Sequence, residues 1–244
     1  MSPSTSEPAH NGLLATLPGP VRRQVLARCE QVEIATAAVL CEPGDRIRHV
    51  FFPIDSFISL ITPSAGGAAS LEIRLVGDEG AMGLSLMLGV NVAPFRGLVQ
   101  GAGQAWRMAA ADFIGEIDES PALRLKLSRY MYVTMVQLAQ TVACTRFHVV
   151  EARLARWLLM TRDRAHADQF RVTHESLAYM LGVRRVGITR AASSLQRQSL
   201  IRYSRGKLRI LDGRGLESAA CGCYTADKKT YSRVMGSSAR HAPT

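Results

Sequence analysis

The sequence predicts an α+β fold in which a β-rich N-terminal domain, a long helix and a basic, mainly helical C-terminal module follow one another. Short apolar runs separated by turn residues recur between residues 39 and 108. Glycine and proline are then absent from residue 122 to residue 181. Between residues 173 and 211, two helical patterns with a glycine between them precede an alternating hairpin pattern. A length of 244 residues leaves room for two ordinary domains.

The N-terminal domain is predicted to be a β-roll that spans residues 20–118. A short helix is expected from about Val21 to Cys29, after the Pro-Gly-Pro at 18–20. Many short strands at close spacing, with turn residues between them, are typical of a β-roll or sandwich. We predict that this domain is a sensor domain and not a catalytic one. The expected strands are Val39–Leu40, Val50–Phe52, Phe57–Ile61, Leu71–Val76, Leu98–Val99 and Ala105–Met108.

A long helix is predicted over residues 119–145, and Pro121 fits its first turn. Apolar residues then recur at spacings of four, four, three and four, which places them on one stripe. The stripe must be covered, either by the β domain of the same chain or by a second chain, and the spacing alone leaves both open. Its members are Leu127, Met131, Met135, Leu138 and Val142.

A second helix is expected from about Val149 to Arg164, with Leu154, Trp157 and Leu158 facing inward. A bihelical motif follows it. Thr173 is a suitable N-cap, and Gly182 can adopt the positive φ that ends a helix and turns the chain sharply.

The second helix of this motif, predicted at about residues 184–198, has the pattern of a recognition helix. Ile188, Ala192 and Leu195 are expected to face inward. The arginines near its start then point outward, where arginine can pair bidentately with guanine in the major groove. A wing of two strands is predicted over residues 200–211, and its basic residues suit phosphate contacts. These basic residues are Arg202, Arg205, Lys207 and Arg209.

The positive charge is concentrated in this C-terminal module. Residues 146–215 carry fifteen Lys/Arg against five Asp/Glu, whereas the rest of the chain carries fifteen of each, so the net charge of +10 lies in one segment. A net positive charge concentrated in one segment is expected of a protein that binds nucleic acid. A solvated basic face that keeps the protein in solution is the alternative that charge alone leaves open.

Over residues 20–216 the chain resembles the Crp/Fnr transcription regulators. The resemblance is sharpest at Glu175, Leu177–Ala178, Leu181–Gly182, Arg185, Arg190, Leu200–Ile201 and the wing. It implies a cyclic-nucleotide-binding-like β-roll sensor domain (double-stranded β-helix/jelly-roll-like) at 20–118, a dimerisation helix at 119–145 and a winged helix-turn-helix at 146–216. It also implies a homodimer on a pseudo-palindromic site in double-stranded DNA, with RNA polymerase as a further partner.

The DNA-binding residues predicted from pattern and resemblance together lie on the bihelical motif and the wing. Val186 departs from the family, because many members have a glutamate there that accepts from cytosine, whereas valine can at most contact a thymine methyl group. The predicted contact residues are Thr173, Arg184, Arg185, Val186, Thr189, Arg190, Arg205 and Lys207.

The sensor domain lacks part of the family's cyclic-nucleotide signature. Arg96 could take the place of the arginine that binds the cyclic phosphate, and it is the predicted ligand-binding residue. Ten residues earlier, however, Leu86 stands where a glutamate would accept from the ribose. The alternative function is a cyclic-nucleotide-binding module that acts on protein partners, and it depends on Arg96. The small-molecule effector is unknown.

No metal site, cofactor or enzymatic activity is predicted. The two N-terminal cysteines are too few for an iron–sulfur cluster, and Cys221-Gly222-Cys223 has neither a second pair nor a nearby histidine in sequence. No nucleophile elbow or phosphate loop is present. Without a leader or an apolar span, we predict a soluble, cytoplasmic protein with reduced thiols and a disordered tail at 225–244. The cysteines are Cys29, Cys41, Cys144, Cys221 and Cys223.

Overall fold

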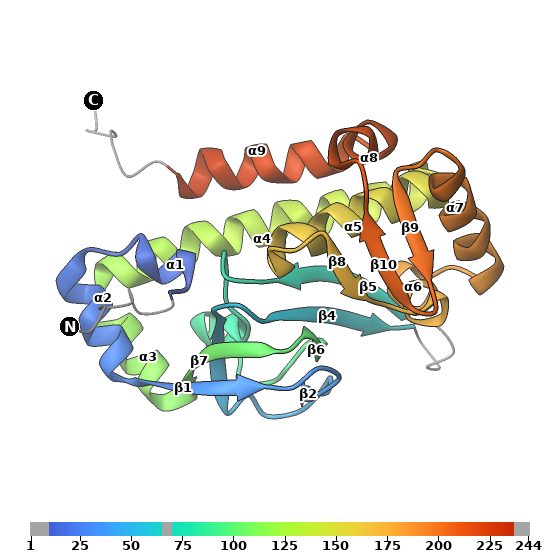
Figure 1. Cartoon of the computed structure of the whole chain (residues 1–244). Coiled ribbons are helices and arrows are strands. Elements are labelled where there is room, and N and C mark those ends of the chain that lie inside the picture. Colours follow the sequence, from blue (N-terminus) through green and yellow to red (C-terminus); the bar gives the residue numbers. More distant parts are fainter. Residues whose placement is uncertain (1–9, 65–69, 237–244) are drawn as a thin grey trace, which may run out of the picture. The chain divides into compact units, whose positions relative to one another are not determined.

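The computed structural model describes residues 10–64 and 70–236 (Figure 1). The chain divides into two compact units, one made of residues 1–58 and 76–128 and the other of residues 59–75 and 129–244. Among the described helices, none is long and apolar enough to cross a membrane.

The first unit is the β-rich one. Its strands β1 and β3 flank β7 in an antiparallel three-stranded sheet, and β2 pairs with β6. Phe52, Met108 and Phe113 are fully buried in its core. The elements are α1 (Gly12–Ala15), α2 (Gly19–Ala27), β1 (Cys29–Ile34), β2 (Val39–Cys41), β3 (His49–Pro53), the 3-10 helix η1 (Leu84–Leu88), β6 (Arg96–Gly101), β7 (Gly103–Ala109) and α3 (Ala110–Glu119).

The six predicted strands are all present, with β4 (Phe57–Pro63) and β5 (Ser70–Val76) completing the set. Four elements of this unit were not predicted: α1, β1, η1 and α3. The predicted N-terminal helix is also two residues out of place, because α2 ends at Ala27 and Cys29 begins β1.

The second unit is mainly helical, and it also contains β5. The helix α4 (Pro121–Phe147) begins at the predicted proline, and a linker of two residues separates it from α5 (Val150–Ala165). The inward residues expected on α5 are buried. The remaining elements are β8 (Gln169–Arg171), α6 (His174–Leu181), α7 (Arg185–Arg197), β9 (Ile201–Ser204), β10 (Lys207–Ile210), α8 (Gly213–Ala219) and α9 (Cys223–Met235).

The predicted disordered tail is wrong for residues 225–235, which form most of α9 (Figure 1). Polar contacts attach this helix to α5: Arg156 Nη2 lies 2.7 Å from Asp227 Oδ2, and the Tyr224 hydroxyl donates to Asp163 Oδ2 over 2.8 Å. Both Arg156 and Asp227 are buried. The polar residues of α9 therefore include one partner of a buried ion pair and do not indicate disorder. Residues 237–244 of the predicted tail lie outside the described part of the chain.

The apolar stripe predicted on α4 is only partly exposed. Leu127 is buried, and Met131 and Leu138 are half-buried, whereas Met135 is 63% and Val142 67% exposed. The exposed seam runs instead along positions at alternating spacings of three and four. Within the second unit these positions are Tyr132, Met135, Ala139 and Val142.

Candidate nucleic-acid interface

The bihelical motif has the predicted start and turn. The Thr173 hydroxyl caps α6 by accepting from Ser176 N at 3.0 Å, and Gly182 ends the helix with φ +61°. The buried guanidinium of Arg153, on α5, donates to the carbonyl oxygen of Leu181. Because the last carbonyls of a helix lack internal partners, this bond fixes the end of α6.

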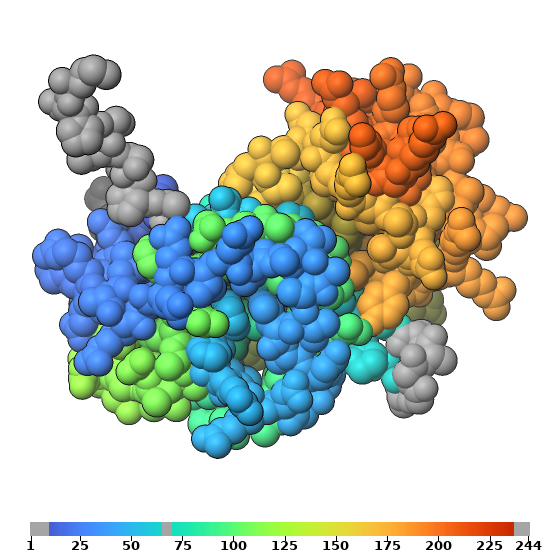
Figure 2. All heavy atoms as spheres, turned by 60° about the horizontal axis from the view of Figure 1, so that its bottom comes forward, coloured from blue at the N-terminus to red at the C-terminus, as the bar shows by residue number. Residues whose placement is uncertain are grey.

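Helix α7 separates a buried face from an exposed basic one. Ile188, Ala192 and Leu195 are fully or almost fully buried, as predicted. Arg184 is the N-cap residue of α7, and five side chains at the start of this helix are exposed. Figure 2 draws this part of the chain in orange. The exposed residues are Arg184, Arg185, Val186, Thr189 and Arg190.

His174 connects the three parts of the motif. Its Nδ1 lies 3.1 Å from Thr189 Oγ1 on α7, and its ring stacks on Tyr203 of the wing with centroids 4.5 Å apart. The Tyr203 hydroxyl donates to Val172 O at 2.9 Å. Partial burial, and then the positive charge of Arg185, lower the pKa of His174. A neutral imidazole at neutral pH therefore joins α6, α7 and the wing.

The wing has three strands instead of the predicted two, in the order β8-β10-β9. The hairpin of β9 and β10 is confirmed, and its tip residues Arg205 and Gly206 both have positive φ, as a type I′ turn requires. The tip presents Arg205 and Lys207 to solvent. A tight, twisted turn thus places two cations at one end of the sheet.

Part of the charge surplus counted in the sequence is not available to a ligand. Arg153 and Arg156 are buried, and Arg156 is paired with Asp227. Most of the basic residues that remain exposed lie on α7 and the wing. They are Arg171, Arg184, Arg185, Arg190, Arg197, Arg202, Arg205, Lys207 and Arg209.

Arg96, the predicted ligand-binding residue, is paired within its own unit. Its Nε lies 3.4 Å from Glu42 Oε1, and its side chain is 35% exposed. Leu86, at the position of the missing ribose acceptor, is buried in η1.

The structure also brings together four residues, of which the sequence analysis related only Cys221 and Cys223 to one another. Cys144, His148, Cys221 and Cys223 place their ligand atoms within 4.8 Å of one another. The histidine missing near the cysteine pair in sequence is thus supplied from the linker between α4 and α5.

Residues 152–219 match a family model described as the Crp-like helix-turn-helix domain. None of the curated proteins compared matches the chain.

Solved structures of Crp/Fnr regulators share the fold. FixK2 from Bradyrhizobium japonicum has a TM-score of 0.67 at 11% identity, covering 79% of this chain and 98% of its own. The c-di-GMP-responsive global regulator CLP from Xanthomonas campestris has a TM-score of 0.66 at 15% identity, covering 79% and 99%. A Crp/Fnr-family transcriptional regulator from Thermus thermophilus has a TM-score of 0.63 at 21% identity, covering 78% and 98%.

The exposed arginines on α7, the supporting bihelical motif and the wing lie within the matched domain, and the chain as a whole has the fold of these regulators. The chain therefore contains a Crp-like helix-turn-helix domain at residues 152–219 and has the fold of Crp/Fnr transcription regulators.

Proposed function

We propose that the chain acts as a homodimer that reads a pseudo-palindromic site in double-stranded DNA, with α7 of each protomer in a major groove. The observation that carries this proposal is the exposed basic start of α7, backed by a fully buried opposite face. Arg185 and Arg190 reach base edges, where each can pair with the acceptors of a guanine, and Val186 contacts a thymine methyl group.

Phosphate contacts come from the wing and from the start of α6. Arg205 and Lys207 at the wing tip lie on exposed backbone and have no role in the core. Thr173 lies at the N-terminus of α6, where backbone N–H groups and the helix dipole favour a phosphate. Such contacts fix the register of the protein on DNA without reading its sequence.

The dimer contact is the exposed seam of α4. Its positions repeat at spacings of three and four, which is the pattern of two helices that pack along a shared axis. Tyr132, Met135 and Val142 are 50%, 63% and 67% exposed, an unusual state for large apolar side chains on one helix face. A second copy of α4 would bury all three.

A dimer of this kind acts on transcription together with RNA polymerase, in the cytoplasm. Its first unit is the sensor, and the effector is a molecule other than a cyclic nucleotide, because Arg96 is already paired with Glu42 and lacks the carboxylate partner for a ribose. No catalytic role is part of the proposal.

The proposal is tested by selecting bound fragments from random duplex DNA with the purified full-length protein. We expect enrichment of inverted half-sites whose centres lie about 10 base pairs apart, or a multiple of that. Arg185→Ala combined with Arg190→Ala abolishes the enrichment, whereas Arg23→Ala, which removes an exposed arginine of α2, leaves it unchanged. Enrichment of single, unpaired sites, or none, contradicts the proposal.

A further inference from the structure

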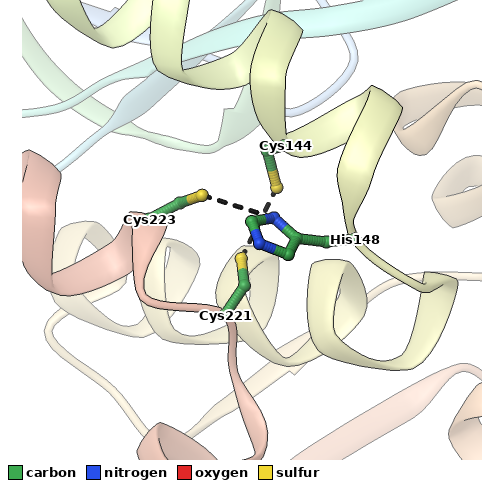
Figure 3. Close-up of side chains that lie close together, drawn as sticks. All are labelled: Cys144, His148, Cys221 and Cys223. Atoms are coloured by element: carbon green, nitrogen blue, oxygen red, sulfur yellow. Dashed lines mark hydrogen bonds between the residues drawn. The ribbon is translucent and has the colours of Figure 1, made fainter.

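Three cysteines and one histidine from distant parts of the chain meet beside the start of α9 (Figure 3). Cys144 lies in the last turn of α4, and His148 lies in the linker that leads to α5. Cys221 precedes α9, and Cys223 is its first residue. Figure 3 shows the three sulfur atoms and the imidazole pointing toward one another.

The distances within this cluster suit one metal ion. Cys144 Sγ lies 3.5 Å from Cys221 Sγ, and Cys223 Sγ lies 3.5 Å from His148 Nδ1. In a tetrahedral zinc centre with three sulfur ligands and one nitrogen ligand, the ligand atoms are about 3.5–3.8 Å apart. These two pairs are thus at the spacing required, and the ligand atoms of all four residues lie within 4.8 Å of one another.

The surroundings also resemble those of a structural metal centre. The three cysteines are buried, and His148 closes the group toward solvent. Gln140 donates from Nε2 to Cys223 Sγ over 3.0 Å, which is the kind of outer contact that orients a thiolate ligand. The Arg156 guanidinium also interacts electrostatically with Cys144.

Other chemistry explains fewer of these residues. A disulfide between Cys144 and Cys221 requires the sulfur atoms to approach to about 2.05 Å and leaves the positions of Cys223 and His148 unexplained. An iron–sulfur cluster binds its ligands through separate irons, which spreads the ligand atoms farther apart than a single ion does. Thiolate and imidazole in a tetrahedral arrangement favour zinc among the divalent metals.

We propose that Cys144, His148, Cys221 and Cys223 bind one Zn²⁺ ion. The four ligands come from the end of α4, the α4–α5 linker and the start of α9, so the ion joins these three segments. Only residues 148 and 149 separate α4 from α5. A ligand in that linker therefore fixes the direction in which α5 leaves α4.

A bound ion at this site affects DNA binding, an inference that rests on the proposed function. In a dimer that pairs through α4, the angle between α4 and α5 sets the separation of the two α7 helices. A bound ion holds that separation, and its removal widens the range of separations. The affinity for a site with fixed half-site spacing then falls, whereas non-specific phosphate binding changes little.

The binding site is tested by measuring metal in the full-length protein, purified under reducing conditions without a chelator. We expect about one zinc per chain, and substitution by Co²⁺ gives the visible absorption of tetrahedral thiolate coordination. Cys223→Ser and His148→Ala lose most of the zinc, whereas Cys41→Ser, in β2, retains it. Protein that carries all five thiols free and takes up no Co²⁺ overturns the site, as does a stable Cys144–Cys221 disulfide in its place.

The consequence is tested on wild-type protein alone, so it does not depend on the folding of a variant. Chelation under reducing conditions lowers the affinity for the selected site at least about tenfold, and added Zn²⁺ restores it. If the protein contains one zinc per chain but its affinity for the selected DNA site does not change when the zinc is removed, the effect on DNA binding is wrong and the metal site stands. Stoichiometric zinc in a protein that never binds DNA overturns the proposed function and leaves the site standing.

Discussion

Trp157 Nε1 donates a hydrogen bond of 2.8 Å to Glu72 Oε1, and this bond joins α5 to β5 inside the second unit. Glu72 is fully buried and also accepts from the Ser59 hydroxyl. Burial raises its pKa to about 7 from the ordinary 4.5, and the two hydrogen bonds oppose that rise only in part. A strand and the first helix of the DNA-binding module are thus held together by a carboxyl group that titrates near neutral pH.

We predict that Glu72 makes stability depend on pH. Its pKa is higher in the folded than in the unfolded chain, so folding binds a proton, and the contribution of Glu72 to the free energy of unfolding is largest below about pH 4.5. It falls as the pH rises toward 7, by about 3 kcal/mol, and then stays level. Urea unfolding at several pH values should show this slope in the wild type and a flatter one in Glu72→Gln. The exposed Glu217→Gln is the control, and equal slopes in all three proteins contradict the prediction.

Arginines on α7 and cations on the wing should affect DNA binding in different ways. Arg185→Ala and Arg190→Ala each weaken the binding free energy at the selected DNA site by about 1–3 kcal/mol, and each relaxes the base preference at one position of that site. Lys207→Ala weakens binding evenly across sequences and lowers the salt dependence by about one unit of slope. Titrations of specific and scrambled duplexes at several salt concentrations distinguish the two effects. Equal, small losses for all three variants count against the interface.

Val186 should determine one base of each half-site. Its side chain is 54% exposed on the same face as the arginines. A glutamate at this position accepts a hydrogen bond from cytosine N4, so Val186→Glu changes the preferred base there to cytosine, with a discrimination of about 1–3 kcal/mol. Selection from random duplexes with the variant reveals the change, and Val186→Ala serves as the control that removes the methyl contact without adding an acceptor. A variant that selects the wild-type sequence refutes this role.

The exposed seam of α4 should be needed for dimerisation. Met135→Glu combined with Val142→Glu places charges on both protomers along the proposed contact, and sedimentation should then show a monomer. Leu88→Glu is a matched control, because Leu88 is 68% exposed and belongs to η1 in the first unit. A double variant that sediments like the wild type shows that another surface mediates any dimer.

Asp227 should contribute to stability through its buried pair with Arg156. Asp227→Ala leaves the guanidinium buried without its carboxylate, and breaking such a pair costs about 3–5 kcal/mol. Asp168→Ala, at an exposed position, changes the free energy of unfolding little. Arg156→Met added to Asp227→Leu recovers most of the loss, because no buried charge remains unpaired. A cost no larger than that of Asp168→Ala argues that α9 is held by other contacts.

Local patterns predicted two kinds of element. The strands from β2 to β7 follow short apolar runs bounded by turn residues, and the buried faces of α5 and α7 follow apolar residues at helical spacing. Gly182 marked the turn correctly. Strand β1 has no such pattern, because Glu30, Gln31 and Glu33 are polar and the strand lies at a sheet edge. Its place depends on pairing with β7, which is distant in sequence.

The cysteine and histidine cluster could not be predicted for a similar reason. Cys144 and Cys221 are separated by 77 residues, and no spacing rule relates them. They meet because α9 packs against α5, and that packing depends on Arg156 and Asp227, which are 71 residues apart. The same pairing explains why counting charges overstated the basic surface, since buried arginines are indistinguishable from exposed ones in composition.

The buried and exposed faces of α7 can change independently during evolution. Ile188, Ala192 and Leu195 anchor the helix, while the outward residues near its start make no side-chain contribution to the core. Substitutions at positions 184–186 and 190 can therefore accumulate with little loss of stability. Duplicated copies of this gene would be able to acquire new target sites while keeping the same scaffold.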